Sequence, residues 1–197
     1  MLKMVLATRN IGKAREMKDK LSGYPVIIKS LIDYPQIPEI EENGKTFTDN
    51  AVIKAKTVAE WTNLPSLADD SGLEIDYLGL KPGIYSSRWG KTDREKIEKV
   101  LRALQNIKNE QRSARFVCVM SLVIPGQQTY TTTGTCSGRI TRLPQGHLGF
   151  GYDPVFIPDG YNRTFAQLGI KIKNNISHRA VALEKMLKII IDHFQLQ

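Results

Sequence analysis

Two adjacent carboxylates, Asp69 and Asp70, are the clearest candidates for chemistry in this sequence. They follow the apolar stretch 64–68 and precede Ser71-Gly72. We expect them at the end of a buried strand, where ligand sites of α/β sheets gather and where carboxylates can hold Mg²⁺ or accept a proton from water. The simpler alternative is a turn, because Asp, Ser and Gly side chains and backbones favour turns.

A second acidic segment lies upstream, in a proline-punctuated loop that ends near Gly44 and carries Glu39, Glu41 and Glu42. By default such a loop is simply solvated. It gains interest because Mg²⁺ takes several oxygen ligands, and these come from separate segments of a chain.

Cations near two helix starts form a third feature. A helix N-terminus carries partial positive charge, so a cation there destabilises the helix by about 0.3–1 kcal/mol. A bound anion would make the contribution of that cation favourable. Free N–H groups with Lys and Arg side chains would form a phosphate site. The alternative is that exposed cations tolerate a small penalty. The residues are Arg9 and Lys13 at the first helix, and Lys171, Lys173, His178 and Arg179 before and within the first turn of the last helix.

Lys54 is the fourth feature, because it lies on or beside the apolar stripe that Ala51 and Val58 define. A lysine at such a position usually extends its ammonium to solvent along the apolar surface. The functional alternative is an inward lysine near the acidic pair and a phosphate.

The segment 146–154, GHLGFGYDP, combines three glycines with Phe150 and Tyr152. The rings could simply cover the core. Glycines that let the backbone approach a ligand, beside an aromatic face that stacks on a base, would also suit nucleotide recognition.

Several other signatures are absent or discounted. The chain has no G-x-x-x-x-G-K-[ST], G-x-G-x-x-G, H-E-x-x-H or G-x-S-x-G motif. Gly134–Gly138 has the form of a cysteine nucleophile elbow, but no helical pattern follows it. Asp70-Ser71-Gly72 matches one aspartic-protease motif without the second copy that such enzymes need. Cys118 and Cys136 are expected to be buried thiols, since they lack metal or disulfide spacing.

The elements that must position these residues alternate between strands and helices. Apolar patterning predicts strands at 2–7, 26–32, up to Asp69, 73–75, 114–124 and 128–136, the last two as a hairpin across Pro125-Gly126. It predicts helices at 11–21, from Thr46 or Thr48 to about 58, at 93–107, and after a Ser177 cap to Phe194. We therefore expect an α/β fold with a mixed sheet, as one domain over residues 1–197 with two lobes.

Composition narrows the class of protein. The chain is 41% hydrophobic and 24% charged, and its apolar runs are too short to span a bilayer. It shows no signal-peptide pattern, so we expect a cytoplasmic protein without a membrane partner. The net charge of +8 favours anionic ligands. A non-catalytic nucleic-acid-binding module is therefore the rival hypothesis, although the basic residues form no helical stripe.

With these residues assembled, the sequence closely resembles the inosine triphosphate pyrophosphatase family. The resemblance implies an ITPase-like fold, with a long central mixed sheet flanked by helices and a cleft between two lobes. It also implies a homodimer with no stable nucleic-acid partner, which hydrolyses dITP, ITP, XTP and dXTP to the monophosphate and pyrophosphate with Mg²⁺ as cofactor. The matching segments cover nearly the whole chain: LATRNIGKAREM, FTDNAVIKAK, LPSLADDSGLEIDYLGLKPGIYSSR, ARFVCV, GFGYDPVFIP, TFAQL and KNNISHRAVAL.

The resemblance also implies roles for individual residues. Asp70 resembles the proton acceptor and magnesium ligand, and either Glu41 or Glu42 a second ligand. Arg9 departs from the glycine of many members and adds a cation beside the phosphates. The implied phosphate-binding residues are Thr8, Arg9, Asn10, Ile11, Gly12, Lys13, Lys54 and Ser71, and the implied base pocket is Phe150, Gly151, Tyr152, Asp153, Lys173, His178 and Arg179.

Base selection should depend on the substituent at the purine 6-position. Lys173 and Arg179 only donate hydrogen bonds, so they can bond a 6-oxo group but not pair with the amino group of adenine. A related enzyme for modified pyrimidine triphosphates remains an alternative, with the same chemistry and another base.

Overall fold

The structure is a computed structural model that describes residues 1–196, and the chain divides into two compact units. Unit 1 contains residues 1–70, 118–133 and those from 181 onward, whereas unit 2 contains 71–117 and 134–180. Hydrogen bonds order the strands β2-β1-β3-β5-β6-β7, with β4 paired to β3 off this path. Parallel and antiparallel pairs both occur, so the mixed α/β prediction is confirmed.

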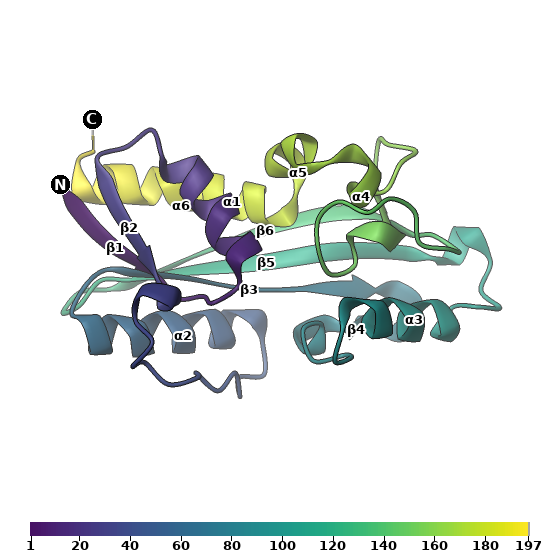
Figure 1. The fold of residues 1–197 in the computed structure, drawn as a ribbon, viewed down its shortest axis with the longest axis horizontal. Helices are drawn as coiled ribbons and strands as arrows, with labels where there is room; N and C mark the ends of the chain where they lie inside the picture. The colour runs from purple at the N-terminus through teal and green to yellow at the C-terminus, as the bar shows by residue number, and fades with distance from the viewer. Residues whose placement is uncertain (197) are drawn as a thin grey trace. The chain divides into compact units, whose positions relative to one another are not determined.

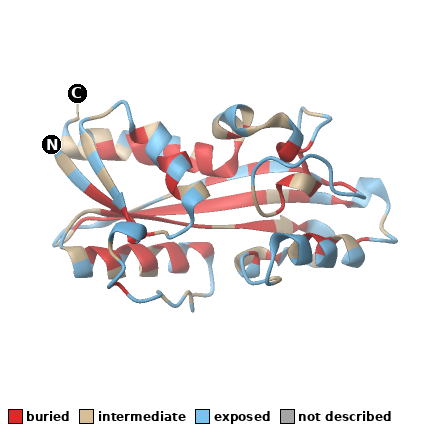
Figure 2. Ribbon diagram, in the orientation of Figure 1, coloured by how far each residue is buried: buried red, intermediate tan, exposed pale blue. Residues whose placement is uncertain are grey.

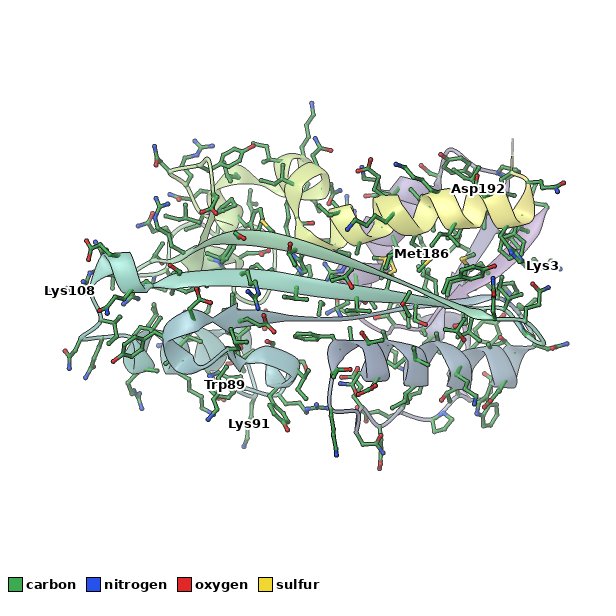
Figure 3. All side chains as sticks on the ribbon, turned by 180° about the vertical axis from the view of Figure 1, so that it is seen from behind. Lys3, Trp89, Lys91, Lys108, Met186 and Asp192 are labelled. Atoms are coloured by element: carbon green, nitrogen blue, oxygen red, sulfur yellow. The ribbon has the colours of Figure 1, made fainter. Side chains whose placement is uncertain are left out.

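Unit 1 places helices on both faces of its strands (Figure 1). β1 (Leu2–Leu6) pairs in parallel with β2 (Val26–Ser30) and with the start of β3 (Ser66–Ile75). α1 (Ile11–Leu21) and α6 (His178–Phe194) pack on one face, where Met186 points toward the strands (Figure 3). α2 (Phe47–Thr62) packs its alanine and valine stripe on the other face. Alternate residues of β1 therefore enter two separate cores.

Two caps fix where the first helices of unit 1 begin. The Asn10 side chain accepts a hydrogen bond from the Lys13 backbone N–H at 3.1 Å, which starts α1. Thr46 accepts from the Asp49 N–H, and the Asp49 carboxylate accepts from the Thr46 N–H in return, which forms a capping box. Thr46, and not Thr48, is thus the cap of α2.

Unit 2 packs helices against the remaining parts of the strands. β4 (Lys81–Pro82) pairs with β3, and β7 (Phe156–Pro158) pairs antiparallel with the end of β6 (Thr129–Ile140). The buried rings of Phe116, Phe156 and Phe165 form the centre of its core. β3 and β5 (Ser113–Val123) are buried along nearly their whole length (Figure 2). The helices of unit 2 are α3 (Asp93–Ala103), α4 (Phe165–Leu168) and α5 (Ile170–Ile176).

The acidic pair does not end a strand, so that prediction and its turn alternative are both wrong. β3 continues from Ser66 through Asp69 and Asp70 to Ile75. The misprediction has a physical cause: two buried carboxylates are unexpected inside a strand unless cations compensate them, and sequence spacing does not show that lysines from α1 and α2 do so.

Other boundaries shift less. α3 stops at Ala103 rather than 107, because the Leu104 carbonyl accepts a bond from the buried Arg112 guanidinium at 2.6 Å instead of continuing the helix. β6 extends to Ile140, and the short helices α4 and α5 were not predicted. No helix within residues 1–196 has both the length and the apolar character needed to cross a membrane.

Candidate active site

Unit 1 gathers the acidic pair around a buried lysine. The Lys54 ammonium lies 2.6 Å from Oε1 of Glu42 and 3.7 Å from Oδ1 of Asp70. Burial acts to lower the pKa of Lys54, but the charges of Asp69, Asp70 and Glu42 outweigh it and raise that pKa. Lys54 therefore points inward, and it is cationic. We call this group the Lys54 cluster; it comprises Lys13, Glu42, Asn50, Lys54, Asp69 and Asp70.

Asp70 is the member of this cluster whose environment suits proton transfer. Its side chain is 7% exposed, and burial raises its pKa, although the Lys54 and Lys13 charges and a hydrogen bond from Asn50 oppose the shift. The Asn50 amide donates to Oδ2 of Asp70 at 3.1 Å, while its own oxygen accepts from the Gly44 N–H at 2.8 Å. A buried amide thus orients the carboxylate that a raised pKa makes more basic.

Asp69, adjacent in the strand, has a different partner. Its Oδ2 lies 2.9 Å from the Lys13 ammonium, and the Asp69 side chain is fully buried. Successive side chains of a strand point to opposite faces. The ion pair holds Lys13, a residue of the first turn of α1, so an internal carboxylate already offsets the cation at this helix start.

The remaining residues of the predicted phosphate segment form the loop into α1 and the first two residues of that helix. Thr8 accepts a bond from the Asn10 N–H at 3.1 Å, so these two side chains shape the turn before the helix. The Arg9 guanidinium donates to the Ile37 carbonyl at 2.5 Å, which ties the segment to the acidic loop. Ile11 is 73% exposed, and Gly12 is partly exposed beside it.

The acidic loop places one glutamate in the cluster. Glu42 is partly buried against Lys54, whereas Glu39 and Glu41 are exposed. Among residues 1–196, no three His, Cys, Asp or Glu side chains converge in a way that could hold a metal ion. Mg²⁺ fits this arrangement nevertheless, since it is commonly held by one or two carboxylates together with substrate phosphates. Asp70 and Glu42, which share the Lys54 cation, are the oxygen donors that suit it.

Unit 2 gathers the predicted base-binding residues around an aromatic ring. The Lys173 ammonium lies 4.0 Å from the centroid of the Phe150 ring, and the Arg179 guanidinium carbon lies 5.8 Å from it. Lys173 also pairs with Oδ2 of Asp153 at 2.6 Å, with both side chains at most 5% exposed. We call this group the Phe150 cluster; it comprises Ser71, Phe150, Asp153, Lys173 and Arg179.

Asp153 organises the loop that carries Phe150. Its Oδ2 accepts the Phe150 backbone N–H at 3.0 Å as well as the Lys173 ammonium. Gly149 has φ +82, and a Cβ built there would clash with the same oxygen. Glycine is therefore needed at 149 both for the backbone conformation and for the close approach of the carboxylate. Gly151, at φ +62, has nothing within 4 Å of such a Cβ.

The start of α6 supplies the remaining predicted residues. Ser177 caps the helix by accepting the Ala180 N–H at 3.2 Å, as its sequence position predicts. Arg179 donates to the Ser71 hydroxyl at 3.1 Å, so Ser71 belongs with this cluster. The buried His178 ring stacks on Phe116 with centroids 4.7 Å apart, and the Tyr152 hydroxyl donates to the Ser86 carbonyl.

Sequence reasoning missed two contributors. Asn50 lies four residues before Lys54, hence on the same face of α2, and a polar residue at that spacing was the available signal. Phe116 is an ordinary strand residue in the sequence, and only the structure shows that it stacks on His178.

Comparison of this chain with known protein families and proteins found clear matches. The sequence model of the Ham1 family matches residues 4–189. A dITP/XTP pyrophosphatase of Bacillus licheniformis is 48% identical over 189 residues, which cover 94% of this chain and 96% of that protein. A dITP/XTP pyrophosphatase of Bacillus subtilis is 46% identical and covers 96% of this chain and 98% of its own length.

Solved structures give the same result. A HAM1 protein from Coxiella burnetii superposes with a TM-score of 0.89 at 43% identity, covering 98% of this chain and all of that one. The match spans both units, and it extends the resemblance first seen in the motifs to the whole fold. The chain belongs to the Ham1 family.

Proposed function

We propose that this protein hydrolyses non-standard purine nucleoside triphosphates, namely ITP, dITP, XTP and dXTP, to the monophosphate and pyrophosphate. Similar proteins bear the name dITP/XTP pyrophosphatase. The observation that supports the reaction best is the buried carboxylate of Asp70, whose pKa is raised by burial and by the charge of Glu42 against the opposing charge of Lys54. Such a group can accept a proton from water near neutral pH more readily than an exposed aspartate.

The chemistry is attack of water on the α-phosphorus. The new P–O bond forms to the water oxygen, the bond to the β-phosphate oxygen breaks, and Asp70 takes the proton. Lys13 and Lys54 offset negative charge on the triphosphate. Thr8 and Asn10 shape the turn that starts α1, and a helix N-terminus favours an anion. Asn50 keeps the Asp70 carboxylate in one orientation throughout.

Asp70 and Glu42 are the residues proposed to hold Mg²⁺. When bound, the ion would neutralise charge on the leaving pyrophosphate and the attacked phosphate. Lys54 lies against both carboxylates, which supports the idea that this position favours a cation. Of the two glutamates that the sequence left open, Glu42 is preferred because Glu41 is exposed.

The Phe150 cluster is proposed to select the base. Phe150 offers a ring on which a purine can stack, and the two cations beside it only donate hydrogen bonds. A 6-oxo group accepts from such donors, but the 6-amino group of adenine leaves them without an acceptor, which penalises ATP. Asp153 keeps Lys173 in place for this role.

The deciding experiment measures pyrophosphate release from ITP, XTP, dITP, GTP, ATP and modified pyrimidine triphosphates, with and without Mg²⁺. The proposal expects release from the 6-oxo purines ITP, XTP and dITP, dependence on Mg²⁺, and little release from ATP. A preference for a modified pyrimidine triphosphate would leave the proposed hydrolysis to pyrophosphate in place but would replace purines by pyrimidines as the substrates. No release from any of them would refute the proposed function.

Assembly as a cytoplasmic homodimer belongs to the same proposal. Unit 2 exposes apolar side chains around β4, and exposed apolar surface favours association. They are Tyr77, Leu80 and Tyr85. Sedimentation equilibrium should give twice the chain mass, and the variant Tyr85→Glu should shift the result toward the monomer.

A further inference from the structure

Hydrogen bonds hold the peptide planes on both sides of the Phe150 α-carbon. The N–H of Phe150 donates to Oδ2 of Asp153 at 3.0 Å, and the N–H of Gly151 donates to Oδ2 of Asp93 at 2.7 Å. A residue has only two soft backbone dihedrals, φ and ψ, and each is defined by one of its flanking peptide planes. The two carboxylates together therefore fix the direction in which the Phe150 side chain leaves the backbone.

The two carboxylates come from different places. Asp153 lies in the same loop as Phe150 and is buried, whereas Asp93 is the first residue of α3 and lies 58 residues away from Gly151 along the chain. Asp93 follows the segment that contains Trp89 and Lys91 (Figure 3). Nothing in the spacing of the sequence connects α3 with the glycine loop, and none of the segments that match the family motifs includes Asp93.

The surroundings of Asp93 favour the ionised carboxylate that accepts the Gly151 N–H. Its Oδ1 lies 3.0 Å from the Lys96 ammonium one helical turn later, and its position in the first turn of α3 suits a negative charge. Burial acts to raise the pKa of Asp93, but the bonds from the Gly151 N–H and from Lys96 outweigh it and lower that pKa. The carboxylate is therefore ionised at neutral pH and accepts a charge-assisted bond from the loop.

We infer that Asp93 is a positioning residue for base selection: through the Gly151 N–H it sets the orientation of Phe150 relative to Lys173 and Arg179. This inference rests on the proposed function, because it assigns base selection to the Phe150 cluster. The 150–151 peptide is also held at its carbonyl, by a longer bond from the Asp153 N–H to the Phe150 oxygen at 3.3 Å. Gly151 has positive φ and open space around it, so without the shorter bond to Asp93 this peptide can rotate more freely. The Phe150 ring would then leave its place beside Lys173, 4.0 Å from the ammonium.

Three variants separate this role from general effects. Asp93→Ala removes the acceptor. Asp93→Asn removes the charge but keeps an oxygen that can accept the Gly151 N–H. Glu98→Ala is the matched control, because it removes one negative charge from the same helix at an exposed pair with Arg94. Asp93→Ala and Asp93→Asn lose the same favourable charge at the helix start, so a difference between them reports the bond from the Gly151 N–H.

The measurement is calorimetric binding of IMP and of AMP to each variant, which requires no turnover. Asp93→Ala should bind IMP about tenfold more weakly, the size expected for one lost hydrogen bond to a charged group, and its preference for IMP over AMP should fall. Asp93→Asn should retain most of the preference, and Glu98→Ala all of it. An unchanged preference in Asp93→Ala would overturn the inference, as would an equal loss in Asp93→Ala and Asp93→Asn.

A second readout tests the contact itself. With glycine labelled by ¹⁵N, the Gly151 amide resonance should shift as Asp93 titrates at acidic pH, and it should move on Asp93→Ala but not on Glu98→Ala. A resonance insensitive to Asp93 would also overturn the inference. If the wild type prefers IMP to AMP but releases no pyrophosphate from ITP, the proposed function fails while the positioning role of Asp93 stands.

Discussion

The Lys54 ammonium lies 3.7 Å from Oδ1 of Asp70, and both side chains are at most 10% exposed. In such a buried pair the carboxylate depends on the cation, because removal of Lys54 leaves Asp70 desolvated without the ammonium beside it. The Lys54 cluster contains three carboxylates and two lysines, so the balance of charge within it governs both stability and the basicity of Asp70.

Asp70→Asn should abolish turnover and leave folding nearly intact. Asparagine cannot accept the proton from water, and general-base catalysis contributes about 10²–10⁴ in rate. Stability should change by less than about 1 kcal/mol, because burial already disfavours the charge that is lost and Lys54 keeps its ion pair with Glu42. Pyrophosphate release and urea unfolding measure the two effects, with Asp76→Asn, an exposed aspartate, as the control. A folded and active Asp70→Asn would remove Asp70 from the mechanism.

Asn50→Ala should move the acidic limb of the pH–rate profile to higher pH. The Asn50 amide favours the charged form of Asp70, so its loss raises the pKa of that carboxylate further. Protonated Asp70 cannot act as a base, so kcat/KM should begin to fall at a higher pH than in the wild type. Asn106→Ala, at an exposed position, serves as control. A limb that stays in place would show that Asn50 does not act through Asp70.

Lys54→Met should destabilise the protein by about 3–5 kcal/mol at neutral pH, because it removes the cation beside the buried Asp70 and the partly buried Glu42. Without Lys54 the pKa of Asp70 in the folded state rises further above its unfolded value. The folded state therefore binds more protons than the unfolded state over a wider range of pH. Stability then falls as pH rises through that range, and the deficit relative to wild type should be smallest at acidic pH. Urea unfolding at several pH values tests this; a deficit that grows on acidification would contradict it.

Arg179→Ala and Lys173→Ala should each reduce kcat/KM for ITP more than for ATP, because each removes a proposed donor to the 6-oxo group. The ratio of kcat/KM for ITP to that for ATP should fall about tenfold. Lys173→Ala also leaves Asp153 buried without its cation, so it should cost stability as well. The control is Lys188→Ala, which removes an exposed cation from α6 and should change kcat/KM for neither substrate. Equal losses for ITP and ATP would refute the base-pocket assignment.

Gly149→Ala should destabilise the protein more than Gly160→Ala. Both glycines have nearly the same positive φ, +82 and +81, so the backbone penalty is shared. Only at 149 does the added Cβ meet Asp153, whereas nothing lies within 4 Å at 160. We expect Gly160→Ala to cost about 1 kcal/mol and Gly149→Ala at least about 1 kcal/mol more, as read from urea unfolding. Equal costs would mean that the Asp153 carboxylate can move away.

The sequence predicted best the features that depend on local patterning. The Ser177 cap followed from its place before a helical pattern and is confirmed, and the inward Lys54 was one of two alternatives that helical spacing allowed. The acidic pair was misplaced at a strand end because its lysine partners come from α1 and α2, far away in the sequence. Asp93 was missed for the same reason, since it contributes through one hydrogen bond to a distant segment, whereas the four-residue spacing of Asn50 from Lys54 was a local signal left unused.

The boundary between the two compact units falls at the peptide bond between Asp70 and Ser71, inside β3. Consecutive residues of one strand thus belong to groups with different tasks: Asp70 to the proposed phosphate chemistry, and Ser71 to the proposed choice of base. If both proposed assignments hold, substitutions within 71–117 and 134–180 would retune which nucleotide is accepted, while the residues proposed to carry out hydrolysis remain unchanged.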